Sequence, residues 1–249
     1  TLVLAAVLFT FQIYGDFSGY SDIAIGTAKL FGINLMRNFN VPYFSRDIAE
    51  FWRRWHISLT TWFRDYVYIP LGGSRPVVPE RLKAKGERQA ARYIKWIAVR
   101  NTFVIFLLSG FWHGANWTFV SWGAYHALLF VPLLVMNKNR RFMDDERQWT
   151  DIPRMLLTFV LVVIGWIFFR ASDMASCWDY FSGIWQLSLF TLPVVENALL
   201  LWATIAAIIV MLIIERTKQL PNRWWLYYGL LVAIWWFAGQ DVDFIYFQF

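Results

Sequence analysis

His113, one of the three histidines of this chain, lies inside a long stretch without Asp, Glu, Lys or Arg, residues 101–137. A helix needs roughly 20 apolar residues to cross the hydrocarbon core of a bilayer, so this stretch is long enough for two crossings. The sequence GAN at 114–116 is poor helix sequence and predicts a break between them. An ionisable side chain beside such a break is a functional-site hypothesis by default. The alternative is a buried histidine that is hydrogen-bonded to a neighbouring carbonyl group.

A second histidine, His56, lies in segment 42–70, whose apolar residues recur at the i, i+3, i+4, i+7 spacing of one helical stripe. The pattern predicts one strongly amphipathic helix that lies along the membrane interface or at the wall of a cavity. Charged residues, among them Glu50 and Arg53, fall on the opposite face. His56 falls at the rim of the apolar stripe, from which a side chain can point into a wet cleft. Packing is the equal alternative.

The composition is that of an integral membrane protein. Hydrophobic residues make up 58% of the chain and charged residues only 16%, against roughly 25% charged residues in soluble domains. The net charge of +6 does not indicate nucleic-acid binding, because the basic residues form short clusters between apolar runs, as in cytoplasmic loops. The single cysteine, Cys177, excludes an internal disulfide framework and cannot alone form a metal site. We therefore expect neither a metal centre nor a nucleic-acid partner.

The other segments are predicted to build a membrane scaffold around these histidines. Segment 15–33 mixes glycines, serines and two aspartates with apolar residues, which suggests a broken or re-entrant segment. Asp16 and Asp22 are predicted to cap short helices there, with a direct role as the alternative. Spans are predicted at 1–14, 155–169, 197–214 and 224–240, and a partly embedded segment at 180–195.

Segment 70–100 is predicted to be a cytoplasmic loop, because it carries eight basic residues against two acidic ones. Residue 1 is a threonine in an apolar run, with no basic region before it, so we expect no signal peptide. We expect residues 1–249 to be a single membrane domain and the C-terminal portion of a longer protein.

Four segments carry a recognisable pattern: QIYGDFSGYSDIAIGTAKLFGI at 12–33, RDIAEFWRRWHISLTTWFRDYVYIPLGG at 46–73, SGFWHGANWTFVSWGAYHALL at 109–129 and FIYFQF at 244–249. Together they resemble the membrane-bound O-acyltransferase (MBOAT) family, and more narrowly its bacterial alginate O-acetyltransferase subgroup, AlgI in type. The resemblance covers essentially the whole chain. It implies an all-α, polytopic membrane fold with re-entrant or broken helices and amphipathic interfacial helices. It also implies opposing funnels that meet near the middle of the bilayer.

The resemblance also implies site residues. His113, in the WHG segment, matches the histidine regarded as catalytic throughout the family. His56, in the RRWH segment, matches a second position, where many relatives carry asparagine. Trp112 and Asn116, which flank His113, and His126, in the WGAYH segment, are predicted supporting residues. Core packing is the alternative for His126.

Acetyl transfer from a thioester to a sugar hydroxyl, the chemistry that the resemblance implies, suits these residue types. The hydroxyl proton must be removed as its oxygen attacks the carbonyl carbon, and a neutral imidazole is well matched to that task near pH 7. We expect His113 to be the general base. His56 is expected to orient the acyl carbonyl group or to stabilise the oxyanion by donating a hydrogen bond. A covalent acetyl-histidine intermediate is the alternative mechanism.

The resemblance implies a multi-pass protein of the bacterial cytoplasmic (inner) membrane, with acetyl-CoA as the donor substrate and no bound cofactor. The expected partners are the lipid bilayer and a separate extracytoplasmic polysaccharide acetyltransferase that receives the acetyl group for O-acetylation of an alginate-like exopolysaccharide. Two alternatives stay open: a teichoic acid D-alanyl transferase, and a non-catalytic transporter or scaffold.

Overall fold

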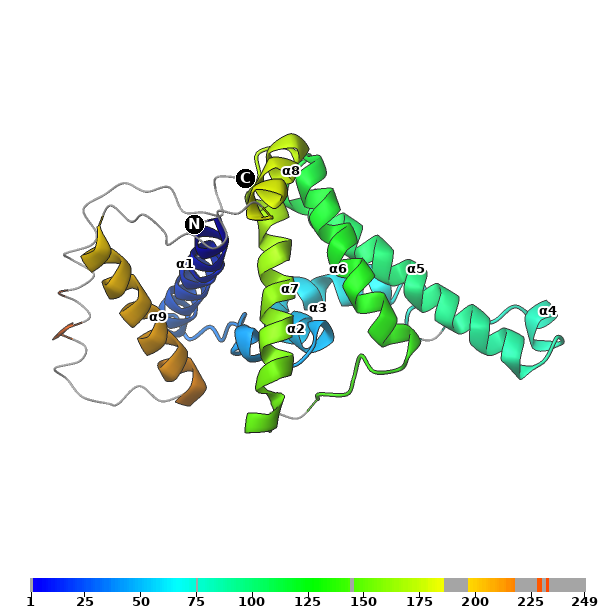
Figure 1. The fold of residues 1–249 in the computed structure, drawn as a ribbon. Helices are drawn as coiled ribbons and strands as arrows, with labels where there is room; N and C mark the ends of the chain where they lie inside the picture. Colours follow the sequence, from blue (N-terminus) through cyan, green and yellow to red (C-terminus); the bar gives the residue numbers. More distant parts are fainter. Residues whose placement is uncertain are drawn as a thin grey trace.

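The computed structural model describes residues 2–74, 76–143, 146–185 and 197–217, together with residues 228, 229 and 232. Over these residues the chain is helical, without a β-strand, which confirms the predicted all-α class. The helices, shown in Figure 1, are α1 (Leu2–Leu30), α2 (Ile48–Arg54), α3 (Ile57–Phe63), α4 (Glu80–Lys83), α5 (Glu87–His113), α6 (Trp117–Val135), α7 (Ile152–Arg170), α8 (Met174–Ile184) and α9 (Ala198–Thr217). Single helical turns lie at Pro42–Phe44, Arg64–Tyr68 and Trp149–Asp151.

Four of the described helices, α1, α5, α6 and α7, are long and apolar enough to cross a membrane. In none of them is more than 39% of the most apolar stretch buried inside the protein, so most of their surface is available to lipid or to further helices. This confirms a multi-pass membrane protein. The predicted partly embedded segment 180–195 is described only to residue 185. Helix α8 covers this first part. The predicted span 224–240 lies outside the described residues apart from positions 228, 229 and 232.

Helix α1 is continuous through the glycines that suggested a break. No proline lies between Leu2 and Leu30, and a glycine costs only about 1 kcal/mol in a helix, against about 3 kcal/mol for proline. Asp16 and Asp22 therefore lie inside one helix and cap nothing. The predicted re-entrant break at 15–33 is wrong.

Helices α5 and α6 form an antiparallel hairpin whose turn is the predicted break at residues 114–116. Two glycines set how closely the helices approach. A β-carbon at Gly110 would collide with the carbonyl group of Phe119, and one at Gly123 with that of Phe106. Small residues at such contacts let helix backbones meet directly. Helix α5 already begins at Glu87, so the last part of the predicted loop 70–100 is helical.

The predicted amphipathic helix over 42–70 is two short helices, α2 and α3, that meet at His56. Trp55 has an extended backbone, and His56 is left-handed with φ 45°. A non-glycine residue at positive φ ends a helix, and this conformation turns α3 away from the direction of α2. Glu50 is also not on a solvated face, since only 1% of it is exposed.

A buried ionic cluster explains why charged residues of α2 face inward. Glu50 accepts from Arg46 at 3.1 Å and from Arg54 at 2.9 Å, and Arg46 lies 3.6 Å from Asp151 at the start of α7. The guanidinium of Arg46 also lies over the ring of Phe142, 4.2 Å from its centre. A buried charge is tolerated when it is paired and hydrogen-bonded. The cluster ties α2 to the segment between α6 and α7.

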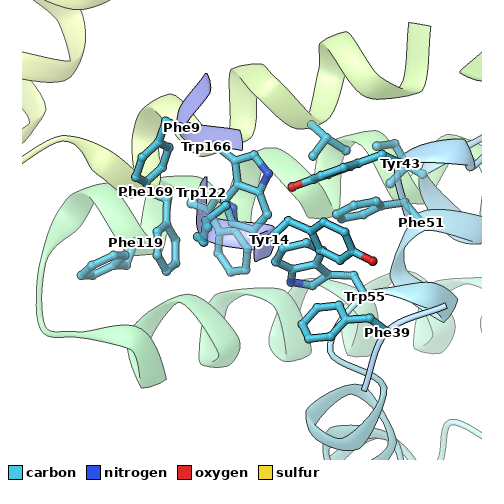
Figure 2. Packing of buried hydrophobic residues seen from close by; sticks show 13 residues of the cluster. Phe9, Tyr14, Phe39, Tyr43, Phe51, Trp55, Phe119, Trp122, Trp166 and Phe169 are labelled. Carbon is cyan, nitrogen blue, oxygen red and sulfur yellow. The ribbon is translucent and has the colours of Figure 1, made fainter. Parts of the chain in front are cut away.

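The core is aromatic and brings together α1, α2, α6 and α7. Tyr14, Phe51 and Trp122 are each at most 1% exposed. Figure 2 shows that the cluster runs from Phe9, Phe119, Trp122, Trp166 and Phe169 on one side to Tyr14, Phe39, Tyr43, Phe51 and Trp55 on the other. Edge-to-face contacts dominate, as aromatic pairs prefer. This core holds α2 against α1, α6 and α7.

Candidate active site

A cavity of about 570 Å³ lies between α2 and α3 on one side and α1, α5, α6 and α7 on the other. Its size and its mostly apolar wall are typical of sites for small molecules. The wall includes His56 and His113 together with Phe17, Trp52, Trp55, Phe106, Trp122, Trp166 and Phe169. The two histidines predicted to share a site therefore line the same cavity.

His113 is the last residue of α5, and aromatic rings surround it. Its ring centre lies 4.9 Å from that of Phe169, 5.0 Å from Trp112 and 5.4 Å from Trp122. The α5–α6 hairpin places Trp122 opposite the histidine. Phe169 is in the last turn of α7, so His113 lies beside the end of that helix that leads into α8.

His56 joins α2 to α3 and is held by both apolar and polar neighbours. Its ring centre lies 4.7 Å from Phe17 and 6.5 Å from Trp112. Nδ1 lies 3.5 Å from Ser58 Oγ. Nε2 is buried and has no hydrogen-bond partner among the described residues. Burial lowers the pKa of His56 from its ordinary 6.5 to about 4, so the ring is neutral at pH 7.

The three predicted supporting residues do not line this cavity. Asn116 caps α6 by accepting from Thr118 N, and its Nδ2 donates to Ser172 O at 2.7 Å. Trp112 is half exposed and contacts both cavity histidines through its ring. His126 is fully buried behind the wall, with its ring 5.0 Å from Trp52 and 5.1 Å from Trp122.

The end of the cavity away from His113 is basic. Arg53, Arg64 and Arg140 line it, and no Asp or Glu is among its described lining residues. Arg53 donates to the carbonyl groups of Asn139 and Phe142 at 2.6 and 2.8 Å, which holds the segment that carries Arg140. The wall follows α6 from Trp122 to Leu134, a distance of about 18 Å along the helix axis.

Sequence reasoning missed Trp122 and Arg140 as cavity residues. Trp122 is one tryptophan among sixteen, and only its place opposite His113 in the hairpin distinguishes it. Arg140 was one charge of a basic cluster. A signal was present in its position five residues after the end of α6, because a short connection from a spanning helix keeps a side chain near the cavity that the helix lines.

A second cavity of about 440 Å³ lies between α1, α7 and α8. Arg170, Ser172, Ser176 and Tyr180 give it polar groups, and Trp166 lines both this cavity and the first. The side chain of Trp166 is 2% exposed. It therefore forms a wall shared by the two cavities.

The fold and site define a multi-pass, all-helical membrane protein with an internal apolar cavity that carries two histidines. The model of the membrane-bound O-acyltransferase family matches residues 1–86. The chain is 43% identical over 192 residues to the probable alginate O-acetylase AlgI of Pseudomonas aeruginosa, covering 74% of this chain and 32% of that protein. The chain belongs to the membrane-bound O-acyltransferase family and is similar to its AlgI-type members.

Two further relatives carry other names. The peptidoglycan O-acetyltransferase of Helicobacter pylori is 39% identical over 182 residues, which is 73% of this chain and 31% of that protein. The teichoic acid D-alanyltransferase of Bacillus subtilis is 35% identical over 170 residues, which is 65% of this chain and 39% of that protein. The chain thus spans about a third of the length of the curated relatives that it matches.

Proposed function

We propose that this protein is a membrane O-acetyltransferase. It takes an acetyl group from acetyl-CoA at the cytoplasmic face of the bacterial inner membrane and passes it to the other side, for O-acetylation of an alginate-like exopolysaccharide. The observation that carries the proposal is the apolar cavity lined by both His56 and His113. The names of relatives at 39–43% identity, alginate O-acetylase and peptidoglycan O-acetyltransferase, support acetyl as the transferred group.

In this proposal His113 is the general base. Its imidazole takes the proton of the acceptor hydroxyl as the oxygen bonds to the acyl carbon. The carbon–sulfur bond then breaks, and the proton passes to the departing thiolate. A well-placed base contributes on the order of 10² to 10⁴ in rate. The aromatic rings around His113 exclude water, which favours transfer to the acceptor over hydrolysis.

The basic end of the cavity supports a phosphorylated thioester as the donor. Arginine binds phosphate oxygens through two parallel hydrogen bonds. Of the three arginines that line the cavity, Arg53 already donates to two backbone carbonyl groups, and Arg64 pairs with Asp65. Arg140 is therefore the residue that we propose for the phosphates. With the phosphates held near Arg140, a long flexible arm reaches along α6 to His113. The thioester then lies among apolar and aromatic side chains.

The second cavity supports the proposal that the acceptor enters from one end of the spanning helices and the donor from the other. Its polar groups lie at the end of α7 near α8, away from the segment that joins α6 to α7. We propose that the acceptor, or a separate extracytoplasmic polysaccharide acetyltransferase, engages this end. Trp117 and Trp178, which are 74% and 73% exposed there, give such a partner aromatic surface to contact.

Purified protein incubated with acetyl-CoA labelled in the acetyl group tests the proposal. We expect thioester cleavage with label on an alginate-type oligosaccharide or on the partner enzyme. Label that crosses a reconstituted vesicle without thioester cleavage would refute the proposal in favour of a transporter. Transfer from a D-alanyl carrier protein, but not from acetyl-CoA, would refute it in favour of the D-alanyl reaction.

A further inference from the structure

A chain of polar groups ends at the His56 ring. Asn38 Oδ1 accepts from the backbone N–H of Ser58 at 3.1 Å and from the Ser58 hydroxyl at 2.6 Å. The same Ser58 oxygen lies 3.5 Å from His56 Nδ1. Neither Asn38 nor Ser58 lines the cavity. Their side chains reach the cavity residue His56 through the Ser58 hydroxyl, and the Asn38 carbonyl group also accepts from the backbone N–H of the lining residue Ile57.

The hydrogen atoms shared between Asn38, Ser58 and His56 can be assigned by elimination. The backbone N–H of Ser58 identifies the atom that it reaches on Asn38 as the amide oxygen. Ser58 has one hydroxyl hydrogen, and its short contact with that oxygen uses it. The Ser58 oxygen can then only accept a hydrogen bond, so the hydrogen of the neutral His56 ring is on Nδ1. A neutral imidazole with its hydrogen on Nδ1 carries a lone pair on Nε2.

That lone pair is buried and unused. His56 Nε2 has no hydrogen-bond partner among the described residues. Other atoms of the His56 side chain line the cavity, whereas Nε2 itself is buried, so a substrate group reaches Nε2 when the surrounding side chains move. A buried acceptor without a partner is destabilising and calls for an explanation. His56 is also one of the non-glycine residues held at positive φ, a strained conformation that gathers at functional sites.

We infer that Asn38 and Ser58 are positioning residues that hold His56 as a hydrogen-bond acceptor, whose Nε2 binds an N–H or O–H group of the substrate. The inference deepens the proposed function and rests on it for the substrate. The group that His56 binds is either an amide N–H of the CoA arm or a hydroxyl of the sugar acceptor. This role replaces the predicted one, in which His56 donates to the acyl oxygen.

Two variants test the role of the hydrogen on Nδ1. Ser58→Ala frees the ring to take either neutral form, and we expect kcat/KM to fall roughly 3- to 10-fold. In the Ser58→Ala protein, incorporating Nδ1-methylhistidine at position 56 removes the ring N–H. The lone pair on Nε2 is then the only hydrogen-bonding site of the ring. We expect activity to return to within about twofold of wild type. A methylated protein less active than Ser58→Ala would overturn the inference, because a donating His56 needs an N–H.

The kinetic constants distinguish the two substrate groups. A higher KM for acetyl-CoA in Ser58→Ala assigns the bound group to the CoA arm, and a higher KM for the sugar assigns it to the acceptor hydroxyl. Unchanged KM values for both would contradict a binding role. Ser182→Ala is the matched control, because Ser182 also donates its hydroxyl locally, to Asp179 O on α8, away from the cavity.

Nitrogen-15 NMR of labelled histidine separates this inference from the proposed function, because it needs no turnover. We expect the His56 signals of wild type to show a protonated Nδ1 and an unprotonated Nε2, and the pattern to become mixed in Ser58→Ala. The opposite assignment in wild type would overturn the inference even if acetyl transfer is observed. A wild-type protein without acetyl transfer would refute the proposed function and leave the NMR result to decide the inference.

Discussion

At the scale of single residues, the two cavity histidines differ in what surrounds them. Aromatic rings of Trp112, Trp122 and Phe169 enclose His113, whereas a polar neighbour, Ser58, holds one nitrogen of His56. The contact with Ser58 fixes the hydrogen-bonding form of the His56 ring, which suits a histidine that binds a substrate group.

Arg140 is expected to bind the phosphates of the donor. Arg140→Gln should raise KM for acetyl-CoA roughly 10-fold, since hydrogen bonds to charged groups contribute about 1.5–3 kcal/mol. KM for acetyl-pantetheine, which has no phosphate, should not change. Arg141→Gln is the control, because Arg141 lies against the Phe142 ring and does not line the cavity. Equal effects of Arg140→Gln on both donors would contradict phosphate binding.

His56 should also make stability depend on pH. Its pKa is about 4 in the folded protein and 6.5 ordinarily. Between these values the unfolded chain binds a proton that the folded protein does not, so the free energy of unfolding falls as the pH is lowered from about 6.5 toward 4. Thermal unfolding in detergent should show a weaker dependence in His56→Gln over this range. The same dependence in both proteins would contradict the neutral, buried state of the ring.

At the scale of elements, the α5–α6 hairpin sets the distance between His113 and Trp122. Gly123→Ala places a β-carbon against the carbonyl group of Phe106, and overpacking of this kind costs about 1–3 kcal/mol. We expect a lower melting temperature in detergent and slower acetyl transfer. Gly26→Ala in α1 is the control, because a β-carbon there meets nothing within 4 Å. It should be neutral or stabilise by about 0.5–1 kcal/mol. Similar melting temperatures for the two variants would refute this role of Gly123.

Features that arise from local sequence were predictable at this scale. The hairpin followed from an uncharged stretch too long for one crossing and from poor helix sequence after His113. The break at His56 was not predictable, because the apolar spacing of 42–70 continues across it and tertiary contacts of Trp55 and Phe17 impose the turn. The burial of Glu50 was missed for a similar reason. Its ion-pair partner Arg46 is close in sequence, but Asp151, which pairs with Arg46 and completes the cluster, lies about a hundred residues away in sequence.

At the scale of the whole molecule, the two cavities lie on either side of Trp166. Acyl transfer needs the donor and the acceptor to meet while water stays out, and a shared aromatic wall meets both needs. We expect Trp166→Ala to raise acetyl-CoA hydrolysis in the absence of acceptor, relative to transfer in its presence. Trp149→Ala, in the exposed turn before α7 and away from both cavities, should leave that ratio unchanged. A Trp166→Ala protein with an unchanged ratio would refute the barrier.

The central claim is that His113 carries the chemistry, and its substitution tests this most directly. Transfer of labelled acetyl should be measured in wild type, His113→Ala and His113→Gln, with folding of each verified by gel filtration and thermal unfolding in detergent. We expect both variants to fold and to lose activity on the order of 10² to 10⁴-fold. A folded variant with turnover close to wild type would contradict the account.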